Sequence, residues 1–177
     1  MELKEKAKDF FDKLDLETQP TNEDLRKAAL AANKARAMIM YLIWKEMKEQ
    51  YPEIDADRIM IKASEKFGIH NGKKWGNIKN AKEALYAQSS KAGYLVFQQE
   101  LVEYTEDYAQ KNFRFCPHVD ALKELGATAE EIKFFCQEIL SAGDYSNMIP
   151  HECVKLEFKA QIGNGDDHCA YCVSKVK

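Results

Sequence analysis

An alternation of apolar and polar residues near the C-terminus constrains the fold of this chain more than any other feature. Between residues 154 and 162 every second position is apolar, which is the pattern of a β-strand with one buried face. The turn-forming sequence Gly163-Asn164-Gly165-Asp166-Asp167 follows, and residues 168–176 read as the returning strand. The sequence therefore predicts a β-hairpin that closes the chain.

The first 110 residues show helical periodicity instead. An amphipathic helix is expected over residues 2–15. A second helix begins after Thr21, which acts as N-cap while Asp24 reaches back in a capping box, and it runs to about Gln50. Its segment Ala37–Trp44 is apolar all round. Such a segment is typical of a helix buried in the centre of a domain or shared with a partner subunit, and it suggests a homodimer.

A shorter helix is predicted next, with Asp55 as its N-cap and Gly68 as its end. A glycine-rich loop is expected over residues 68–77, and a long helix over residues 78–110. A further loop is expected over residues 143–150. The apolar face of the shorter helix comprises Ile59, Ala63 and Phe67.

Between these helices and the hairpin, the sequence predicts a short strand and two helices. Residues 112–115 alternate polar and aromatic side chains, as a strand does. Pro117 suits the first position of a helix, so Cys116 becomes its N-cap and Gly126 its end. Thr128 then opens a second helix with another capping box.

The expected fold is therefore α+β, predominantly helical, with a small antiparallel sheet built around the C-terminal hairpin. The 177 residues suit a single domain, with a helical part over residues 1–110 and a cysteine-containing α+β part over residues 111–177. The net charge of −3 without a basic cluster argues against a nucleic-acid partner. The charged N-terminus and the absence of a long apolar run argue against export and against a membrane span, so a cytoplasmic protein with reduced thiols is expected.

Cys116 is the leading candidate for chemistry. At a helix N-cap its sulfur faces free backbone N–H groups and the positive end of the helix dipole, and both favour the thiolate. His118, two residues further on, could hold or relay a proton. The alternative is a buried cysteine that fills space beside Phe113 and Phe115.

The other cysteines allow either core packing or metal binding. Cys136 shares a helix face with apolar residues, which favours the core, but it could also face Cys116. Cys169 and Cys172 are three apart, so on a regular strand they point to opposite faces, which argues against one ion held by both sulfurs. A mixed cysteine and histidine site for zinc or iron remains open. Its candidate ligands are Cys116, His118, His151, Cys153, His168, Cys169 and Cys172.

The hairpin turn carries a second candidate group. Asp166, Asp167 and His168 suit turn geometry by themselves. A carboxylate beside an imidazole is also what a general base requires, so Asp166 and His168 are candidate proton carriers.

Taken in order, several of these residues resemble the family of L-2-amino-thiazoline-4-carboxylic acid hydrolases. The resemblance covers about the last 65 residues, and Ile139 departs from it because the family often has an acidic residue at that position. The enzyme that names the family opens a thiazoline ring, a cyclic amidine, to an N-carbamoyl cysteine. The motifs that carry the resemblance are Phe115-Cys116-Pro117, Glu124-Leu125-Gly126, Cys136, Gly165-Asp166 and Cys169-Ala170-Tyr171.

The resemblance implies working thiols at Cys116, Cys136 and Cys169, with Asp166 close by and Cys136 and Tyr171 against the substrate. A fainter similarity links the chain's ending to small-molecule-binding domains named after 4-vinyl reductase, in which a final hairpin with a cysteine closes over a ligand or metal.

Three hypotheses follow. The first is an enzyme that hydrolyses a C–N bond of a small heterocycle or amide through the Cys116 thiolate. The second is a binding module in which Cys116, Cys136 and Cys169 hold zinc, iron or a small molecule. The third is an interaction domain with inert thiols.

Overall fold

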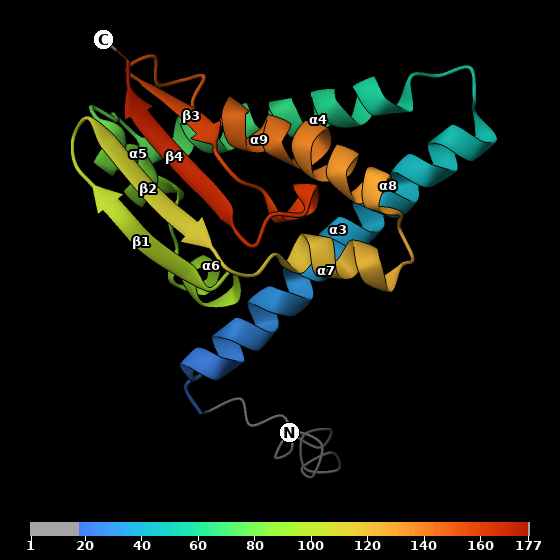
Figure 1. Ribbon diagram of the computed structural model, residues 1–177, viewed down its shortest axis with the longest axis horizontal. Helices are drawn as coiled ribbons and strands as arrows, with labels where there is room; N and C mark the ends of the chain where they lie inside the picture. The colour runs from blue at the N-terminus through green and yellow to red at the C-terminus, as the bar shows by residue number, and fades with distance from the viewer. Residues whose placement is uncertain (1–17, 177) are drawn as a thin grey trace, which may run out of the picture.

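The computed structural model describes residues 18–176, so the helix predicted over residues 2–15 lies outside the described part. The fold is α+β, mostly helical, with one four-stranded antiparallel sheet in the order β1-β2-β4-β3 (Figure 1). The helices are α3 (Asn22–Gln50), α4 (Ala56–Gly72), α5 (Ala81–Gln88), α6 (Lys91–Val96), α7 (Pro117–Glu124), α8 (Ala129–Phe134) and α9 (Ser141–Ser146). The strands are β1 (Gln99–Tyr104), β2 (Tyr108–Phe113), β3 (Val154–Phe158) and β4 (Cys169–Lys175). Short 3-10 helices cover Lys73–Trp75 and Ile162–Asn164, and a π-helix covers Phe135–Leu140.

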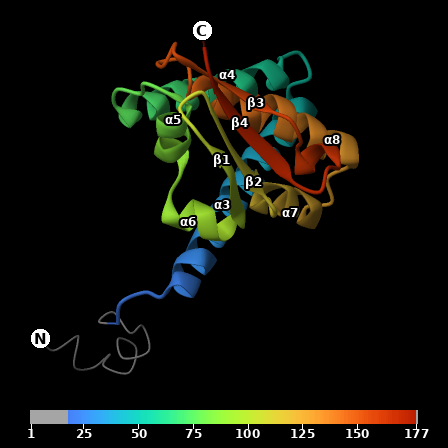
Figure 2. The same ribbon diagram turned by 60° about the vertical axis from the view of Figure 1, so that its left-hand side comes forward.

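The C-terminal hairpin is confirmed and forms one side of the sheet, with β3 at its edge. β3 and β4 pair antiparallel, with Leu156 opposite Val173. β4 also pairs with β2, where Phe113 stands opposite Cys169, so the last strand lies between two others. The helices α5 and α6 lie beside β1 and β2 (Figure 2), where α5 contacts β2 and β4 and α6 contacts β1.

α3 begins and ends as its sequence predicts. The capping box is present: the Asp24 amide donates to Thr21 Oγ1 at 3.2 Å, and the Thr21 amide donates to Asp24 Oδ2 at 2.9 Å. Within the segment that is apolar all round, one face is buried and the other is exposed. The buried residues are Ala37, Tyr41 and Trp44, and the exposed ones are Ile39, Leu42 and Ile43. A homodimer through this exposed face stays a prediction. No helix within residues 18–176 is long and apolar enough to cross a membrane.

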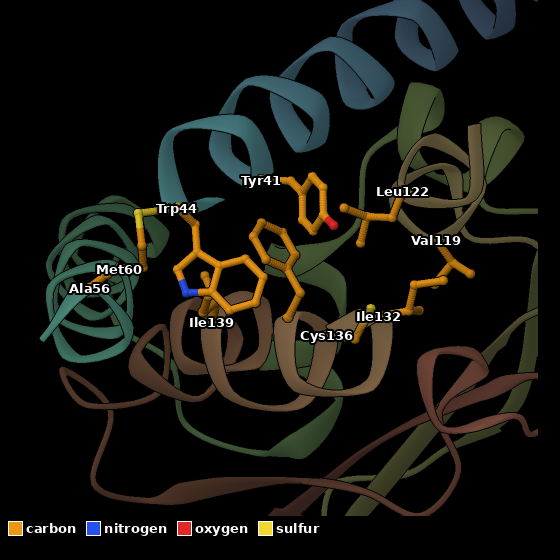
Figure 3. Close-up of a cluster of buried hydrophobic side chains, with 10 residues drawn as sticks. Tyr41, Trp44, Ala56, Met60, Val119, Leu122, Ile132, Cys136 and Ile139 are labelled. Carbon is orange, nitrogen blue, oxygen red and sulfur yellow. The ribbon is translucent and has the colours of Figure 1, made fainter. Parts of the chain in front are cut away.

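The buried face of α3 packs on the π-helix. The ring of Phe135 lies 5.9 Å from that of Tyr41 and 6.1 Å from that of Trp44, measured between centroids. Figure 3 shows Tyr41 and Trp44 pointing from α3 toward the helix that carries Cys136 and Ile139. This cluster fixes the position of the π-helix, and therefore of Cys136, relative to α3.

The prediction of one long helix over residues 78–110 is wrong. The chain forms α5, α6, β1 and β2 there. Two capping residues divide the helical pattern, because Asn80 accepts from the Glu83 amide and Ser90 accepts from the Gly93 amide. Beyond them, β1 and β2 pair antiparallel around a turn at Thr105–Tyr108. A hydrogen bond from the Thr105 amide to the Tyr108 carbonyl oxygen closes this turn. Strand pairing in the sheet therefore overrides the apparent helical spacing.

α4 begins at the predicted N-cap, Asp55, but it continues through Gly68 to Gly72, so half of the predicted 68–77 loop is helical. It also buries a different face from the one expected: Ile59 and Phe67 are exposed. The loop predicted over residues 143–150 likewise begins as helix α9. The buried residues of α4 are Ala56, Met60, Ser64, Gly68 and Gly72.

Small residues form the buried face of α4 because α9 lies directly against it. A Cβ atom at Gly68 would lie 2.1 Å from the Gly143 carbonyl oxygen, and one at Gly72 would lie 2.2 Å from the Asn147 carbonyl oxygen. Only a residue without a side chain allows the two backbones to approach this closely.

We therefore expect Gly68→Ala to lower the free energy of unfolding by about 1–3 kcal/mol through overpacking, although alanine is the better helix former. Urea unfolding measures the change. Gly143→Ala is the matched control, because its Cβ would meet the Ser64 carbonyl oxygen only at 3.4 Å. Equal stability of the two variants would contradict the close α4–α9 contact.

Candidate functional site

A cavity of about 710 Å³ lies between the helices and the sheet. Its walls come from α3, α4, α5, α6, α7, the π-helix, α9 and the inner side of the sheet. The three cysteines that were expected to converge, Cys116, Cys136 and Cys169, all line it. The cavity is large enough for a small-molecule ligand.

Cys116 is the N-cap of α7, and Pro117 is the first helical residue, as predicted. The backbone amides of Val119 and His118 lower the pKa of the Cys116 thiol, as expected for a sulfur at a helix N-terminus. Burial raises that pKa by more, so it lies above its ordinary value. The expectation of a thiolate-favouring site is therefore wrong for the ligand-free protein, in which Cys116 is a neutral thiol at neutral pH.

Cys136 lies on the π-helix, where the Ser141 hydroxyl donates to the Cys136 carbonyl oxygen at 2.7 Å. Its sulfur packs against Gly163 so closely that a Cβ there would lie 2.6 Å from Sγ. Burial raises the pKa of the Cys136 thiol well above its ordinary range, and the nearby Cys116 and Cys169 raise it further. The thiols of Cys116 and Cys169 are therefore near enough to Cys136 to disfavour its ionisation.

Cys169 binds the hairpin loop. Its Sγ accepts a hydrogen bond from the Ile162 amide at 3.2 Å, and burial raises its pKa to about 12. The other two cysteines lie elsewhere. Cys153 donates to the Ile78 carbonyl oxygen at 3.2 Å, and Cys172 is buried without lining the cavity.

The ligand sets considered for zinc or iron are not assembled. Among residues 18–176, no three His, Cys, Asp or Glu side chains form a group that could hold a metal ion. His151 instead stacks on Trp75, and its Nε2 hydrogen bonds to the Gly72 carbonyl oxygen at 2.9 Å. The described residues therefore do not fit a zinc or iron centre.

His118 lines the cavity as a neutral imidazole. Its Nε2 lies 2.6 Å from Arg36 Nη2, and because arginine only donates, Nε2 must accept. Burial and the adjacent Arg36 charge lower the pKa of His118 to about 3. Arg36 Nη2 also donates to Asn33 Oδ1 at 3.4 Å. The sequence indicated His118 as a candidate site residue, but it did not indicate Arg36, the hydrogen-bond partner of His118.

Asp144 is a second residue that the sequence reasoning missed. It lines the cavity from α9. Burial raises the pKa of this carboxyl to about 6, although Arg36 and Lys111 act to lower it. It is close enough to Cys116 and Cys169 to raise the pKa of both thiols. A carboxylate of this kind beside a cysteine is suited to carry a proton.

Lys111, on β2, is a third charged residue that interacts electrostatically with Asp144. It is 1% exposed, and its Nζ donates to Ser89 Oγ at 2.7 Å. Burial lowers its pKa to about 7, partly opposed by Asp144. A signal was present in the sequence, because Ala109, Lys111 and Phe113 alternate toward the buried face of β2 and the lysine is the exception.

The remaining predicted site residues do not line the cavity. Asp166 is exposed and accepts from the Gln161 amide at 2.8 Å, and His168 pairs with the exposed Asp167 at 2.5 Å. Both serve the hairpin turn here. Tyr171 is fully buried behind the cavity wall, against the rings of Phe113 and Phe158, and burial raises its pKa.

Comparison with known proteins extends the motif resemblance beyond the C-terminal third. The model of the L-2-amino-thiazoline-4-carboxylic acid hydrolase family matches residues 32–173, which include every charged and thiol residue of the cavity wall named above. No curated protein matches the chain. The similarity to 4-vinyl reductase domains stays a prediction. The chain belongs to the L-2-amino-thiazoline-4-carboxylic acid hydrolase family.

Proposed function

We propose that this protein hydrolyses a C–N bond of a small cyclic amidine or amide, similar to a thiazoline carboxylate, with Cys116 as the nucleophile. The observation that carries the proposal is a thiol, a carboxyl group and a guanidinium on the wall of one cavity: Cys116, Asp144 and Arg36. The family to which the chain belongs supports the same reaction class.

Cys116 is a better nucleophile candidate than the other two thiols of the cavity. Two backbone amides and Arg36 favour its thiolate, whereas every neighbour of Cys136 that acts on its pKa disfavours ionisation. Cys169 is already engaged with the Ile162 amide. The thiolate is the reactive form of cysteine, so the thiol with the most stabilised thiolate is the one expected to attack.

The reaction begins when Asp144 takes the proton of Cys116 and the sulfur bonds to the amidine carbon. The same carboxyl group then gives the proton to the leaving ring atom, the bond from the amidine carbon to that atom breaks, and the ring opens to leave a thioimidate on Cys116. In a 2-amino-thiazoline, loss of the ring nitrogen leads to an S-carbamoyl product, and loss of the ring sulfur leads to the N-carbamoyl product of the enzyme that names the family. Water adds to this carbon, the C–S bond to the enzyme breaks, and the thiol is restored. The amides at the start of α7 stabilise the negative charge that develops during attack.

Arg36 and His118 position the substrate in this proposal. The Arg36 guanidinium is suited to a carboxylate, and its bond to His118 Nε2 fixes its direction. His118 acts as a positioning residue, because an imidazole with a pKa of about 3 carries no proton at neutral pH. Asp166 and His168, the proton carriers considered from sequence, have no part in this proposal because they do not line the cavity.

Incubation of the purified protein with 2-amino-thiazoline-4-carboxylate tests the proposal. We expect a ring-opened product that has gained one water, measured by mass spectrometry against the same protein alkylated at its thiols. Failure to open any of a panel of cyclic amidines and cyclic amides would contradict hydrolysis.

A second prediction concerns the charge of the substrate. Arg36→Gln is expected to raise KM for a carboxylate-bearing ring by about 10–100-fold, because one charge-assisted hydrogen bond contributes roughly 1.5–3 kcal/mol. Steady-state kinetics measure the change. The same ring without its carboxylate is the control, and an equal rise in KM for both compounds would exclude Arg36 as the carboxylate anchor.

A binding module without catalysis is the second candidate function. The raised pKa values of the Cys116, Cys136 and Cys169 thiols favour it, because neutral thiols line a ligand cavity without reacting. Tight binding of the intact ring without turnover would support it over hydrolysis.

A further inference from the structure

We propose that the substrate is larger than a single ring: a cyclic amidine or amide whose carboxyl side continues into an amide-containing chain, and that Gln88, Gln99 and Asn147 bind this chain. The inference rests on the proposed function, because it takes the same cavity as the substrate site. It adds the class of substrate and three residues that select it.

The size of the cavity supports the larger substrate. A cavity of about 150 Å³ accommodates one benzene ring. The cavity of this protein has about 710 Å³. A lone five-membered ring with a carboxylate would therefore leave most of the volume without a partner, whereas sites of this size suit ligands of several connected groups.

Three primary amides on the wall lack partners. The oxygens Gln88 Oε1, Gln99 Oε1 and Asn147 Oδ1 are buried and have no hydrogen-bond donor within the described chain. All three residues line the cavity, and Gln99 and Asn147 are only 8% and 9% exposed. A buried amide without a partner is costly, so such groups usually mark a place where a ligand or a water completes the bonds.

The chemistry of these amides indicates the class of chain. Each carries one acceptor oxygen and two donor hydrogens, and a half-turn of the terminal amide exchanges which of them faces the cavity. A peptide-like amide presents the complementary pair, one N–H donor and one C=O acceptor. Three such groups, at the end of α5, at the start of β1 and directly after α9, can therefore bind amides of one chain.

A series of contacts from Arg36 to Gln99 indicates that the chain extends from the carboxyl side of the ring. In this extended substrate Arg36 donates to the carbonyl oxygen of the first chain amide, which takes the place of a free carboxylate, and His118 fixes the direction of the guanidinium. The His118 ring contacts Phe97 with 5.5 Å between centroids, and Phe97 contacts Phe113 at the same spacing. Gln99 follows Phe97 closely in the chain and stands opposite Phe113 in the sheet. Arg36 is therefore linked to Gln99, one of the three amides, through His118, Phe97 and Phe113 on the cavity wall.

A matched pair of probes tests the inference. The compact probe is 2-amino-thiazoline-4-carboxamide, and the extended probe is the same ring joined through its carbonyl to glycylglycinamide. We expect kcat/KM of the full-length protein to be at least about 10-fold higher for the extended probe, as two or three added hydrogen bonds would give. Gln99→Leu should bring this ratio close to one.

Two further variants keep the result interpretable. Gln88→Leu is a second test of the same chain site in case Gln99→Leu does not fold, and it should lower the ratio as well. Gln50→Leu makes the same chemical change at an exposed position at the end of α3 and should keep the wild-type ratio.

Calorimetric binding of the two probes separates this inference from the proposed function. If neither probe is hydrolysed, hydrolysis fails as the function, but tighter binding of the extended probe by about 10-fold, lost in Gln99→Leu, would still support the chain site. Equal affinity for both probes in the wild-type protein, or a ratio that Gln99→Leu and Gln88→Leu leave unchanged, would overturn the inference.

Discussion

Asp144→Asn is expected to raise the free energy of unfolding above pH 6 by roughly 2–3 kcal/mol and to lower kcat by about 10²–10⁴-fold, the usual contribution of a general acid–base group. Stability rises because the folded protein holds a carboxyl whose pKa of about 6 exceeds its ordinary value of 3.8, so ionisation opposes folding. Activity falls because asparagine cannot carry the proton between Cys116 and the leaving ring atom. Gains in stability together with losses of activity are typical of functional positions.

The pH dependence of stability determines the direction of the expected difference between Asp144→Asn and the wild type. A carboxyl with a raised pKa favours folding below the unfolded value near 4, and this contribution is lost as the pH rises through about 6. The stability gap between Asp144→Asn and the wild type should therefore be small at pH 4 and full above pH 6. For the same reason, kcat/KM of the wild type should rise with pH through about 6.

Urea unfolding between pH 4 and pH 8 measures the gap directly. Asp107→Asn is the matched control, because Asp107 lies exposed in the turn between β1 and β2. A gap that does not change with pH, or a fully active Asp144→Asn protein, would exclude the assigned role.

Cys116→Ser is expected to lower kcat by about 10³-fold or more, because removing a nucleophile eliminates the covalent route and leaves only binding and electrostatic stabilisation. The serine hydroxyl can occupy the same N-cap and is itself a preferred capping group, so the fold should be kept. Rates of ring opening measured with excess enzyme give the comparison.

Cys153→Ser is the control for this variant. It makes the same atom change at a partly buried thiol that bonds to the Ile78 carbonyl oxygen and does not line the cavity. We expect it to keep wild-type turnover. Comparable losses in Cys116→Ser and Cys153→Ser would point to a general effect on the fold instead of a nucleophile.

Local signals in the sequence were sufficient for much of the fold. The N-caps at Thr21, Asp55 and Thr128 act within one turn of the chain, so neighbouring residues determine them. The hairpin was equally local, because its alternation and its turn residues lie side by side. The Ser90 cap is equally local and was overlooked. The pairing of β1 with β2 was missed because their partner strand β4 lies far away in the sequence.

The candidate site shows the same difference between features that neighbouring residues determine and features that depend on residues far apart in the chain. The family resemblance implied working thiols at Cys116, Cys136 and Cys169, and all three line one cavity. The sequence did not indicate Arg36 or Asp144, because their significance comes from their places on the wall of the same cavity although they are far apart in the chain. Burial also explains why the helix N-terminus fails to favour a thiolate at Cys116: desolvation opposes the two amides and outweighs them.

The central claim is that Cys116 forms a bond with the substrate during hydrolysis. Rapid acid quenching of the protein under turnover, followed by mass spectrometry of its peptides, tests it most directly. The account predicts a ring-opened adduct on the peptide that contains Cys116, which disappears when substrate is exhausted. Turnover with no adduct on any peptide, or an adduct on the peptide of Cys136 or Cys169 alone, would contradict it.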